Sequence, residues 1–369
     1  MTLDPFRGYY PYVRLRAPKS RAETEQRNSR ERYIRSLTFD SPDRVPVMHH
    51  TLKGAWTTYC RELENLYARY PSDVLLSSRT HEPFALGGSE RGHWAGGQVT
   101  YDDWGCGWLW NTPDHMGQTV YFPLAYWDVL ETYRPPDPMS GEEAVEQMVA
   151  EVDADGHQHF VFVDGGELFQ RMIFMRGMEN LMIDLHEDRE EVYVLRDLIT
   201  EVCLKRIERW GATGKVDGII LRDDWGTQQA LMIQPRTWRQ VFLPAYEKLV
   251  EAIHATGAFA SFHSDGVIDD ILPDLVAIGC DEINPQVHVM DIEALGDRYR
   301  GDICVRADMD RQYTMPDGKP EEVRQLVHRL YAAFGSRDGG YVGWAEMNSD
   351  VPIANAEAML ETFYSLPPN

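Results

Sequence analysis

The sequence predicts an α/β fold, a TIM (β/α)8 barrel with an N-terminal arm and an inserted irregular segment. Short apolar runs alternate with helical segments from about residue 141 onward, most of these runs end in polar clusters, and the alternating units number about eight. Strands that alternate with helices pair in parallel through right-handed crossovers, and eight such units close a barrel. A doubly wound open sheet is the competing architecture, but the chain has no GxGxxG loop and no P-loop to support nucleotide binding.

Length and charge restrict the function. A chain of 369 residues that is 43% hydrophobic has ample material for a core, and barrels of this size often form one domain. The net charge of -23 argues against nucleic acids and anionic membranes as partners, because both carry repelling phosphates. No apolar run is long enough to span a bilayer and no secretory signal is recognisable. Five cysteines without CxxC spacing fit reduced thiols in the cytoplasm.

The N-terminal part predicts an arm followed by the first units of the barrel. Residues 1–28 are polar and basic in places, so we expect them to form an arm that packs on the body or on another subunit. A helix is expected at roughly Ser29–Leu37, followed by a short strand that ends at His49 and His50. Residues 29–369 then make up a single barrel domain. Within it, residues 77–140 are rich in Gly, Trp, Asp and Pro and predict an irregular excursion over the mouth.

The remaining chain predicts six helix–strand units. The helices are expected at residues 142–153, 187–211, 236–256, 267–278, 291–299 and 319–335. The strand after each helix ends in polar residues, which are in order Asp164 with Glu167, Asp223 with Asp224, His263 with Asp265, Asn284 with Gln286, Asp308 with Asp310, and Glu346. Because the C-terminal ends of the strands form the active-site face of such a barrel, we expect these side chains to line one cavity.

The stretch AFASFHSDGVIDDILPDLVAIGCDEINPQ, residues 258–286, carries the most chemical information. His263 and Asp265 lie two residues apart at the end of an apolar strand, so both point to the same face while the chain stays extended. An imidazole and a carboxylate that converge there can bind a metal or transfer a proton.

Several segments together resemble the uroporphyrinogen decarboxylase superfamily, and more narrowly its branch of corrinoid-dependent methyltransferases and O-demethylase components. The resemblance covers about residues 29–366 and implies a TIM barrel with its site at the C-terminal mouth. It is carried by RERYIRSLTFDSPDRVPV, DDWGCGW, DDWGTQQALMIQPRTWRQVFLPAYEKLVEAIHATG, FHSDGVIDDILPDLVAIGCDEINPQ and GGYVGWAEMNSDVPIANAEAML.

Within the superfamily the residues favour the methyltransferase branch. Decarboxylases carry an arginine-rich loop after the first strand that grips propionate groups, whereas this chain has MHHTLKGAWTTYCRE there, without paired arginines. In the methyltransferase branch a His-x-Cys at the position of His263 and Asp265 supplies two zinc ligands, and a cysteine after the last strand supplies a third. This chain replaces the first cysteine with Asp265 and offers Glu346 near the position of the second. The resemblance therefore implies a divalent metal, zinc by analogy, held by His263, Asp265 and Glu346.

The other polar residues receive roles around that centre. Asp223, Asp224 and Glu167 are the candidate acids or orienting carboxylates. The candidate substrate-binding residues are His50, Asn284, Gln286, Asp164 and Trp225. The expected reaction transfers a methyl group from a small methylated or methoxylated substrate to a corrinoid on a partner protein. A metal-independent decarboxylase or lyase acting on a small acid and a non-catalytic barrel remain alternatives, and the oligomeric state, a homodimer included, is left open.

Overall fold

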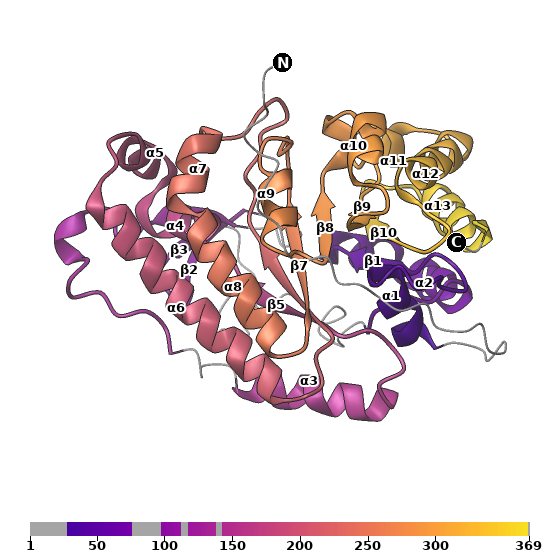
Figure 1. Cartoon of the computed structure of the whole chain (residues 1–369), viewed down its shortest axis with the longest axis horizontal. Helices are drawn as coiled ribbons and strands as arrows, with labels where there is room; N and C mark the ends of the chain where they lie inside the picture. The colour runs from indigo at the N-terminus through magenta and orange to yellow at the C-terminus, as the bar shows by residue number, and fades with distance from the viewer. Residues whose placement is uncertain (1–27, 76–96, 112–116, 138–141, 368–369) are drawn as a thin grey trace, which may run out of the picture.

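The computed structural model describes residues 28–75, 97–111, 117–137 and 142–367, so the expected arm lies almost wholly outside the described residues. At its centre is a parallel sheet with strand order β1-β10-β9-β8-β7-β6-β5 (Figure 1). The seven strands are β1 (Val47–Thr51), β5 (Phe162–Gly166), β6 (Gly218–Arg222), β7 (Phe259–Ser264), β8 (Glu282–Pro285), β9 (Cys304–Ala307) and β10 (Tyr341–Met347). Each strand from β5 onward pairs with the next in sequence, as the predicted parallel β/α arrangement requires.

The place of the predicted eighth strand is taken by a short segment, residues 72–75, which connects the two edge strands. The Asp73 N–H donates to the Val47 oxygen of β1 over 2.8 Å, and the Phe160 N–H beside β5 donates to the Asp73 oxygen over 3.0 Å. The buried Asp73 carboxylate anchors this segment because it accepts hydrogen bonds from Arg32 and Arg44. The sheet is therefore curled and barrel-like, and among the described residues the isolated bridge between Val74 and Phe160 stands in place of an eighth strand.

Helices cover the outer face of the sheet on both flanks (Figure 1). On one flank α6 (Glu190–Ala212) and α8 (Leu243–Ala255) run side by side over β5 to β7. The other flank carries α10 (Ile292–Tyr299), α12 (Pro320–Phe334) and α13 (Ile353–Ser365). Val323, Val327, Leu330 and Phe334 of α12 are buried, and this three-to-four-residue spacing is what one apolar helix face requires.

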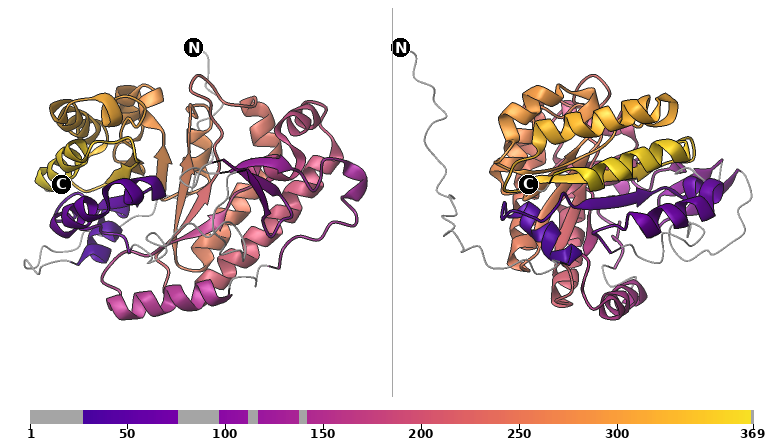
Figure 2. Two further views of the ribbon diagram at one scale, coloured as in Figure 1. Left: turned by 180° about the vertical axis from the view of Figure 1, so that it is seen from behind. Right: turned by 90° about the vertical axis from the view of Figure 1, so that its right-hand side faces the viewer.

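Helices from the first and the last part of the chain lie side by side on this second flank. Helix α2 (Lys53–Arg69) lies beside α13, as both views in Figure 2 show. An ion pair of 2.6 Å joins Arg69 of α2 to Glu357 of α13. The last helix thus packs against the first barrel unit and supports β1, which pairs with β10.

One end of the cylinder is plugged by helix α1 (Ser29–Leu37), whose predicted bounds are confirmed. Its first turn is capped by Asn28, whose side-chain oxygen accepts the Glu31 N–H. Tyr33 inserts its ring against Phe160, with centroids 4.4 Å apart, inside a small apolar cluster. Because apolar side chains close this end, a site within the barrel has to lie at the opposite, C-terminal end of the strands.

Other helices differ from the predicted bounds. The expected helix 236–256 is two helices, α7 (Pro235–Val241) and α8, because Pro244 cannot continue a hydrogen-bonded helix from α7. Of the expected helix 267–278, only α9 (Leu272–Ala277) is α-helical. The remaining elements are α3 (Glu142–Asp155), α4 (Phe169–Arg176), α5 (Met178–His186), α11 (Thr314–Asp317), η2 (Trp127–Val129) and η3 (Val287–Val289).

The segment 77–140 is more regular than predicted. Its described residues contain an antiparallel sheet of β2 (Gln98–Tyr101), β3 (Gly107–Trp110) and β4 (Gln118–Tyr121). Asp102 organises the β2–β3 turn, because its carboxylate accepts the Trp104 and Cys106 N–H groups and the Trp108 indole N–H. Strands of only four residues are too short for their alternation to be recognised from sequence.

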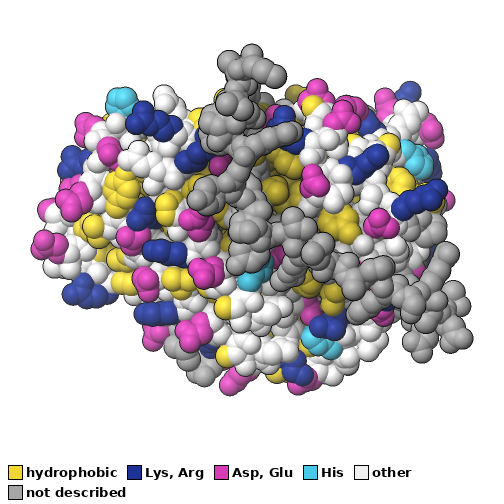
Figure 3. All heavy atoms as spheres, in the orientation of Figure 1, with side chains coloured by type: hydrophobic (Ala, Val, Ile, Leu, Met, Phe, Trp, Pro, Cys, Tyr) yellow, Lys and Arg dark blue, Asp and Glu magenta, His cyan; other side chains and the backbone are white. Residues whose placement is uncertain are grey.

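The surface mixes both charge signs, and acidic and basic side chains are interspersed on the face shown in Figure 3. Among the described residues, none of the helices combines the length and apolar character needed to cross a membrane.

A buried histidine makes stability depend on pH. Burial lowers the pKa of His49 to about 4, and neither of its ring nitrogens has a hydrogen-bond partner among the described residues. An unfolded histidine titrates near 6.5, so the unfolded chain binds more protons between about pH 4 and 6.5, and stability falls as the pH drops through that window. The free energy of unfolding of the wild type should fall by roughly 3 kcal/mol across this window because of His49, and H49L should abolish that fall.

Urea unfolding at pH 7.5, 6 and 4.5 measures this effect. His328 is exposed on α12, so H328L serves as the control and should keep the wild-type pH dependence. If the stability of H49L depended on pH in the same way as that of the wild type, His49 would not be the cause of the acid-dependent loss of stability.

Candidate metal and active site

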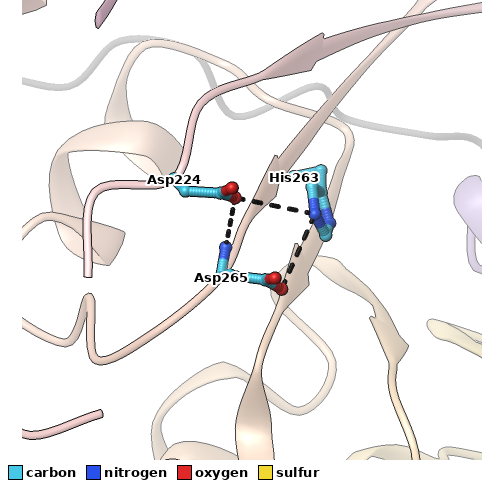
Figure 4. A group of neighbouring side chains, drawn as sticks. All are labelled: Asp224, His263 and Asp265. Atoms are coloured by element: carbon cyan, nitrogen blue, oxygen red, sulfur yellow. Dashed lines mark hydrogen bonds and ion pairs between the residues drawn. The ribbon is translucent and has the colours of Figure 1, made fainter. Parts of the chain in front are cut away.

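Three side chains converge at the C-terminal end of the central strands. Asp224 follows β6, His263 belongs to β7 and Asp265 follows β7, as Figure 4 shows. His263 Nε2 lies 3.9 Å from Asp224 Oδ1 and 3.7 Å from Asp265 Oδ1. These atoms form the one group of three metal-ligating side chains found within the described ranges, and we call Asp224, His263 and Asp265 the Asp-His-Asp cluster.

The next strand fixes the orientation of the imidazole. Asn284 of β8 is in register with His263, and its Oδ1 lies 2.8 Å from His263 Nδ1. The Asn284 amide nitrogen donates to the Arg306 backbone oxygen, so Oδ1 is left as the acceptor and Nδ1 carries the proton. The lone pair on His263 Nε2 therefore faces the two carboxylates, which is the arrangement of a metal-ligating histidine.

Backbone contacts hold the two carboxylates in place. The Asp265 N–H donates to Asp224 Oδ1 over 2.9 Å, and Gln170 donates its side-chain N–H to Asp224 Oδ2 over 2.6 Å. The loops that follow β6 and β7 cross at Gly226 and Gly266, where the Gly226 N–H donates to the Asp265 oxygen. A Cβ on Gly266 would clash with the Gly226 carbonyl group, and the φ of Gly266 is +78°. Only glycine fits this crossing.

We expect G266A to destabilise the protein by on the order of 3 kcal/mol, since it adds a backbone clash to a left-handed φ. Gly257 offers a matched control: its φ of +87° is similar, but nothing lies within 4 Å of the place that a Cβ would take there. G257A should cost only about 1 kcal/mol. Chemical denaturation measures both, and equal losses would show that the crossing is not tightly packed.

The Asp-His-Asp cluster fits a divalent cation. Two ligand atoms that each lie about 2.0–2.2 Å from a tetrahedral metal are separated by roughly 3.3–3.6 Å, and the nitrogen–oxygen distances here are only slightly longer. Burial lowers the pKa of His263, which keeps the imidazole in the neutral form that binds metals. One nitrogen and two carboxylate oxygens are hard ligands that suit zinc and other divalent ions.

Glu346, the predicted third ligand, is not part of this cluster. Its carboxylate accepts hydrogen bonds from His50, the Trp344 indole and Arg311. Although burial opposes ionisation, the hydrogen bond from His50 and the Arg311 charge lower the pKa of Glu346 to about 2. Asp224, which the sequence suggests as an acid, takes the third position instead.

Arg311 is the functional residue that sequence reasoning missed. It follows β9 and bridges Asp265 and Glu346, lying 3.3 Å from Glu346 Oε1 and in direct contact with Asp265 Oδ1. It also lies 3.9 Å from Asp308. Its position directly after the predicted acidic pair at the end of β9 was the available signal.

Two predicted site residues face away from the inside of the curled sheet. Both Asp223 oxygens are used outside the barrel, accepting the Leu168 and Gln170 N–H groups at the start of α4 and the Tyr246 hydroxyl. Burial raises the pKa of Asp223 to about 7. Trp225 is fully buried and stacks on Phe169 with ring centroids 4.1 Å apart. The predictions of Asp223 as an acid and of Trp225 as a substrate contact are therefore corrected, because strand alternation turns both side chains to the outer face.

Glu167 and Asp164 lie near the mouth but have partners of their own. Glu167 and Asp102 share Arg171, at 2.7 and 2.8 Å, so this arginine ties the antiparallel sheet to the barrel. Burial raises the pKa of Glu167, although Arg171 opposes that shift. Asp164 accepts a hydrogen bond from Arg206 over 3.0 Å.

The remaining predicted contacts border the cluster. The His50 side chain is 43% exposed, and its Nδ1 lies 3.2 Å from Glu346 Oε2. The Gln286 side-chain oxygen accepts the Gly266 N–H over 2.7 Å and so supports the loop that carries Asp265.

A family comparison identifies this architecture. The model of the uroporphyrinogen decarboxylase (URO-D) family matches residues 130–366, well over half of the 369 residues. The chain belongs to the URO-D family. Comparison with curated proteins finds no match.

Among solved structures, this URO-D family chain is similar to a methyltransferase from Methanosarcina mazei, with a TM-score of 0.69 and 15% identity. The alignment covers 92% of this chain and 99% of that chain, so the two share a fold over nearly their whole length. A B12-independent methionine synthase from Shewanella sp. W3-18-1 is more distant, with a TM-score of 0.43, 12% identity, and coverage of 60% of this chain and 65% of that chain.

The region after β1 distinguishes this URO-D family member from an arginine-rich decarboxylase loop. The chain passes directly from β1 into α2, whose arginines, Arg61 and Arg69, are exposed. Arg69 pairs with Glu357 on the outer surface. The two arginines of α2 therefore lie on the surface, and His50 of β1 is the residue near the cluster in this region.

Proposed function

We propose that this URO-D family protein is a methyltransferase that transfers a methyl group from a small methoxylated or methylated substrate to a corrinoid carried by a partner protein. The observation that carries the proposal is the orientation of His263, whose Nε2 lone pair faces Asp224 and Asp265. The shared fold with the Methanosarcina mazei methyltransferase supports it.

In this proposal Asp224, His263 and Asp265 hold one divalent metal ion, zinc by the chemistry of the ligands. The ion supplies Lewis acidity toward the substrate atom that bears the methyl group. Asn284 keeps the proton of the His263 imidazole on Nδ1. Arg311 forms an ion pair with Asp265 and partly neutralises its negative charge. His50, whose Nδ1–H donates to Glu346, offers the lone pair on its outer nitrogen, Nε2, as a hydrogen-bond acceptor to the substrate.

A methyl-transfer assay tests the proposal. The protein is incubated with free cob(I)alamin and a panel of methyl ethers, methylated amines and methyl thioethers, and methylcobalamin formation is followed by absorbance. We expect one donor class to react. A metal-containing protein that methylates cob(I)alamin with none of these donors would contradict the proposal.

The second candidate is a carboxy-lyase that acts on a small acid without a metal. It is favoured by the contact between Arg311 and Asp265, which neutralises one cluster carboxylate with a cation from the protein itself. In that case His263 and Asp224 serve as the acid and base pair. Metal analysis separates the two candidates, since a stoichiometric metal favours methyl transfer. A non-catalytic barrel would show no thermal stabilisation by divalent metals or cobalamin.

We further propose a cytoplasmic protein without nucleic-acid or membrane partners, in accordance with the net charge of -23. A homodimer is the assembly we would test first, by light scattering.

A further inference from the structure

We infer that Arg222 binds a carboxylate of the substrate, so that the methyl donor is a small methylated or methoxylated acid. The inference deepens the proposed function and rests on it for the fate of the methyl group. It stands on the place of Arg222 in the sheet, on its unused hydrogen-bond donors and on the charge of its surroundings.

Strand register places Arg222 on the cavity side of the sheet. Arg222 is the last residue of β6 and is in register with His263 of β7. Side chains of in-register neighbours on adjacent strands point to the same face. Asp223, the next residue, faces outward to Tyr246 and α4, so its neighbours Arg222 and Asp224 face inward. Figure 4 shows Asp224 and His263 directed toward each other on this side.

Three other arginines near the mouth, within the described ranges, are already hydrogen-bonded to carboxylates. Arg171 donates to Glu167 and Asp102, Arg206 donates to Asp164, and Arg311 contacts Asp265 and Glu346. Each of these three arginines therefore already pairs with carboxylates of the protein itself.

Arg222 is different. Its Nε lies 3.6 Å from Asp164 Oδ1, beyond hydrogen-bond distance, and across the described ranges it donates no hydrogen bond. Its side chain is 52% exposed. Asp164 is its ion-pair neighbour through Oδ1, without a hydrogen bond, while Arg206 donates to the other oxygen of that carboxylate, Oδ2, over 3.0 Å. The guanidinium fork of Arg222 is thus available, and its geometry matches a carboxylate through two parallel hydrogen bonds.

Strand register makes Arg222 and His263 neighbours at the mouth, so a small acid can contact both. Adjacent strands lie about 4.8 Å apart, so Arg222 and His263 start from neighbouring positions at the mouth. One molecule the size of a substituted benzoic acid or an amino acid spans them. Asp164, Asp224 and Asp265 also lie at this mouth, and Arg222 would offset their repulsion of an entering carboxylate.

Isothermal titration calorimetry tests the inference without requiring turnover. The probes are small methylated acids (methoxybenzoates, methoxyacetate and N-methylated amino acids), each paired with its neutral amide. Wild-type protein, R222Q, R222K and R324Q are compared. R324Q removes the same charge from an exposed pair with Glu361 on α12 and α13.

We expect at least one acid to bind the wild type and R324Q more tightly than its amide does. R222Q should weaken that acid by about tenfold to a hundredfold, leave the amide unchanged, and be partly rescued by R222K. If no acid binds better than its amide, or if R222Q weakens acid and amide equally, the inference is overturned. Failure of the proposed function is a separate result, because an acid preference that depends on Arg222 would then appear without methyl transfer.

Discussion

Replacement of His263 by alanine is expected to remove the metal and methyl transfer together. His263 supplies the single nitrogen ligand of the Asp-His-Asp cluster, and without it two carboxylates face each other with no neutral ligand between them. Metal affinity should fall by more than about 100-fold, since loss of even an outer-shell partner of a ligand costs 10–100-fold. Metal content by elemental analysis and the rate of cob(I)alamin methylation measure the two effects.

His254 provides the control for this replacement. It is an exposed histidine at the end of α8 that pairs with Asp281 over 2.8 Å, and neither residue belongs to the cluster. H254A should retain both metal and activity. Survival of metal and activity in H263A would show that the site is assigned to the wrong residues.

The second large effect concerns the ion pair beneath the site. Arg306 of β9 and Glu282 of β8 are both about 1% exposed and lie 3.0 Å apart inside the barrel. Glu282 also accepts hydrogen bonds from Tyr33 and Ser261. We expect R306M to lower the free energy of unfolding by about 3–5 kcal/mol, because it leaves a buried carboxylate without its cation. Chemical denaturation at pH 7 measures this loss.

A double replacement shows whether the unpaired charge is the cause. E282Q/R306M removes the charge on Glu282, so it should be less destabilised than R306M alone. R329M breaks an exposed ion pair with Glu293 and should leave stability nearly unchanged. If E282Q/R306M is as unstable as R306M, loss of packing around Trp344 explains the effect instead.

Much of the fold could be predicted from the sequence because its signals are local. Apolar strands followed by polar residues marked the ends of β5 to β10, and helix periodicity gave α1, α10 and α12 within one or two residues. The closing bridge at residues 72–75 depends on Asp73 meeting Arg32 and Arg44, which lie 41 and 29 residues away in sequence. Contacts of that kind leave no periodic pattern.

The site could be predicted only in part for the same reason. His263, Asp265 and Asn284 meet as the two-residue period and the parallel pairing require. Asp224 and Asp223 are adjacent in sequence, and only the strand register decides which of them faces the cavity. Glu346 lies outside the Asp-His-Asp cluster and pairs with Arg311, and sequence spacing does not encode that contact.

Metal content decides whether the Asp-His-Asp cluster is a metal centre. Elemental analysis of protein purified without added metals is compared for the wild type, D224N, D265N and E346Q. We predict about one divalent ion per chain in the wild type and in E346Q, and a strong loss in D224N and D265N, since those carboxylates belong to the cluster. A wild type without stoichiometric metal, or a metal that depends on Glu346 and not on Asp224, would contradict this assignment.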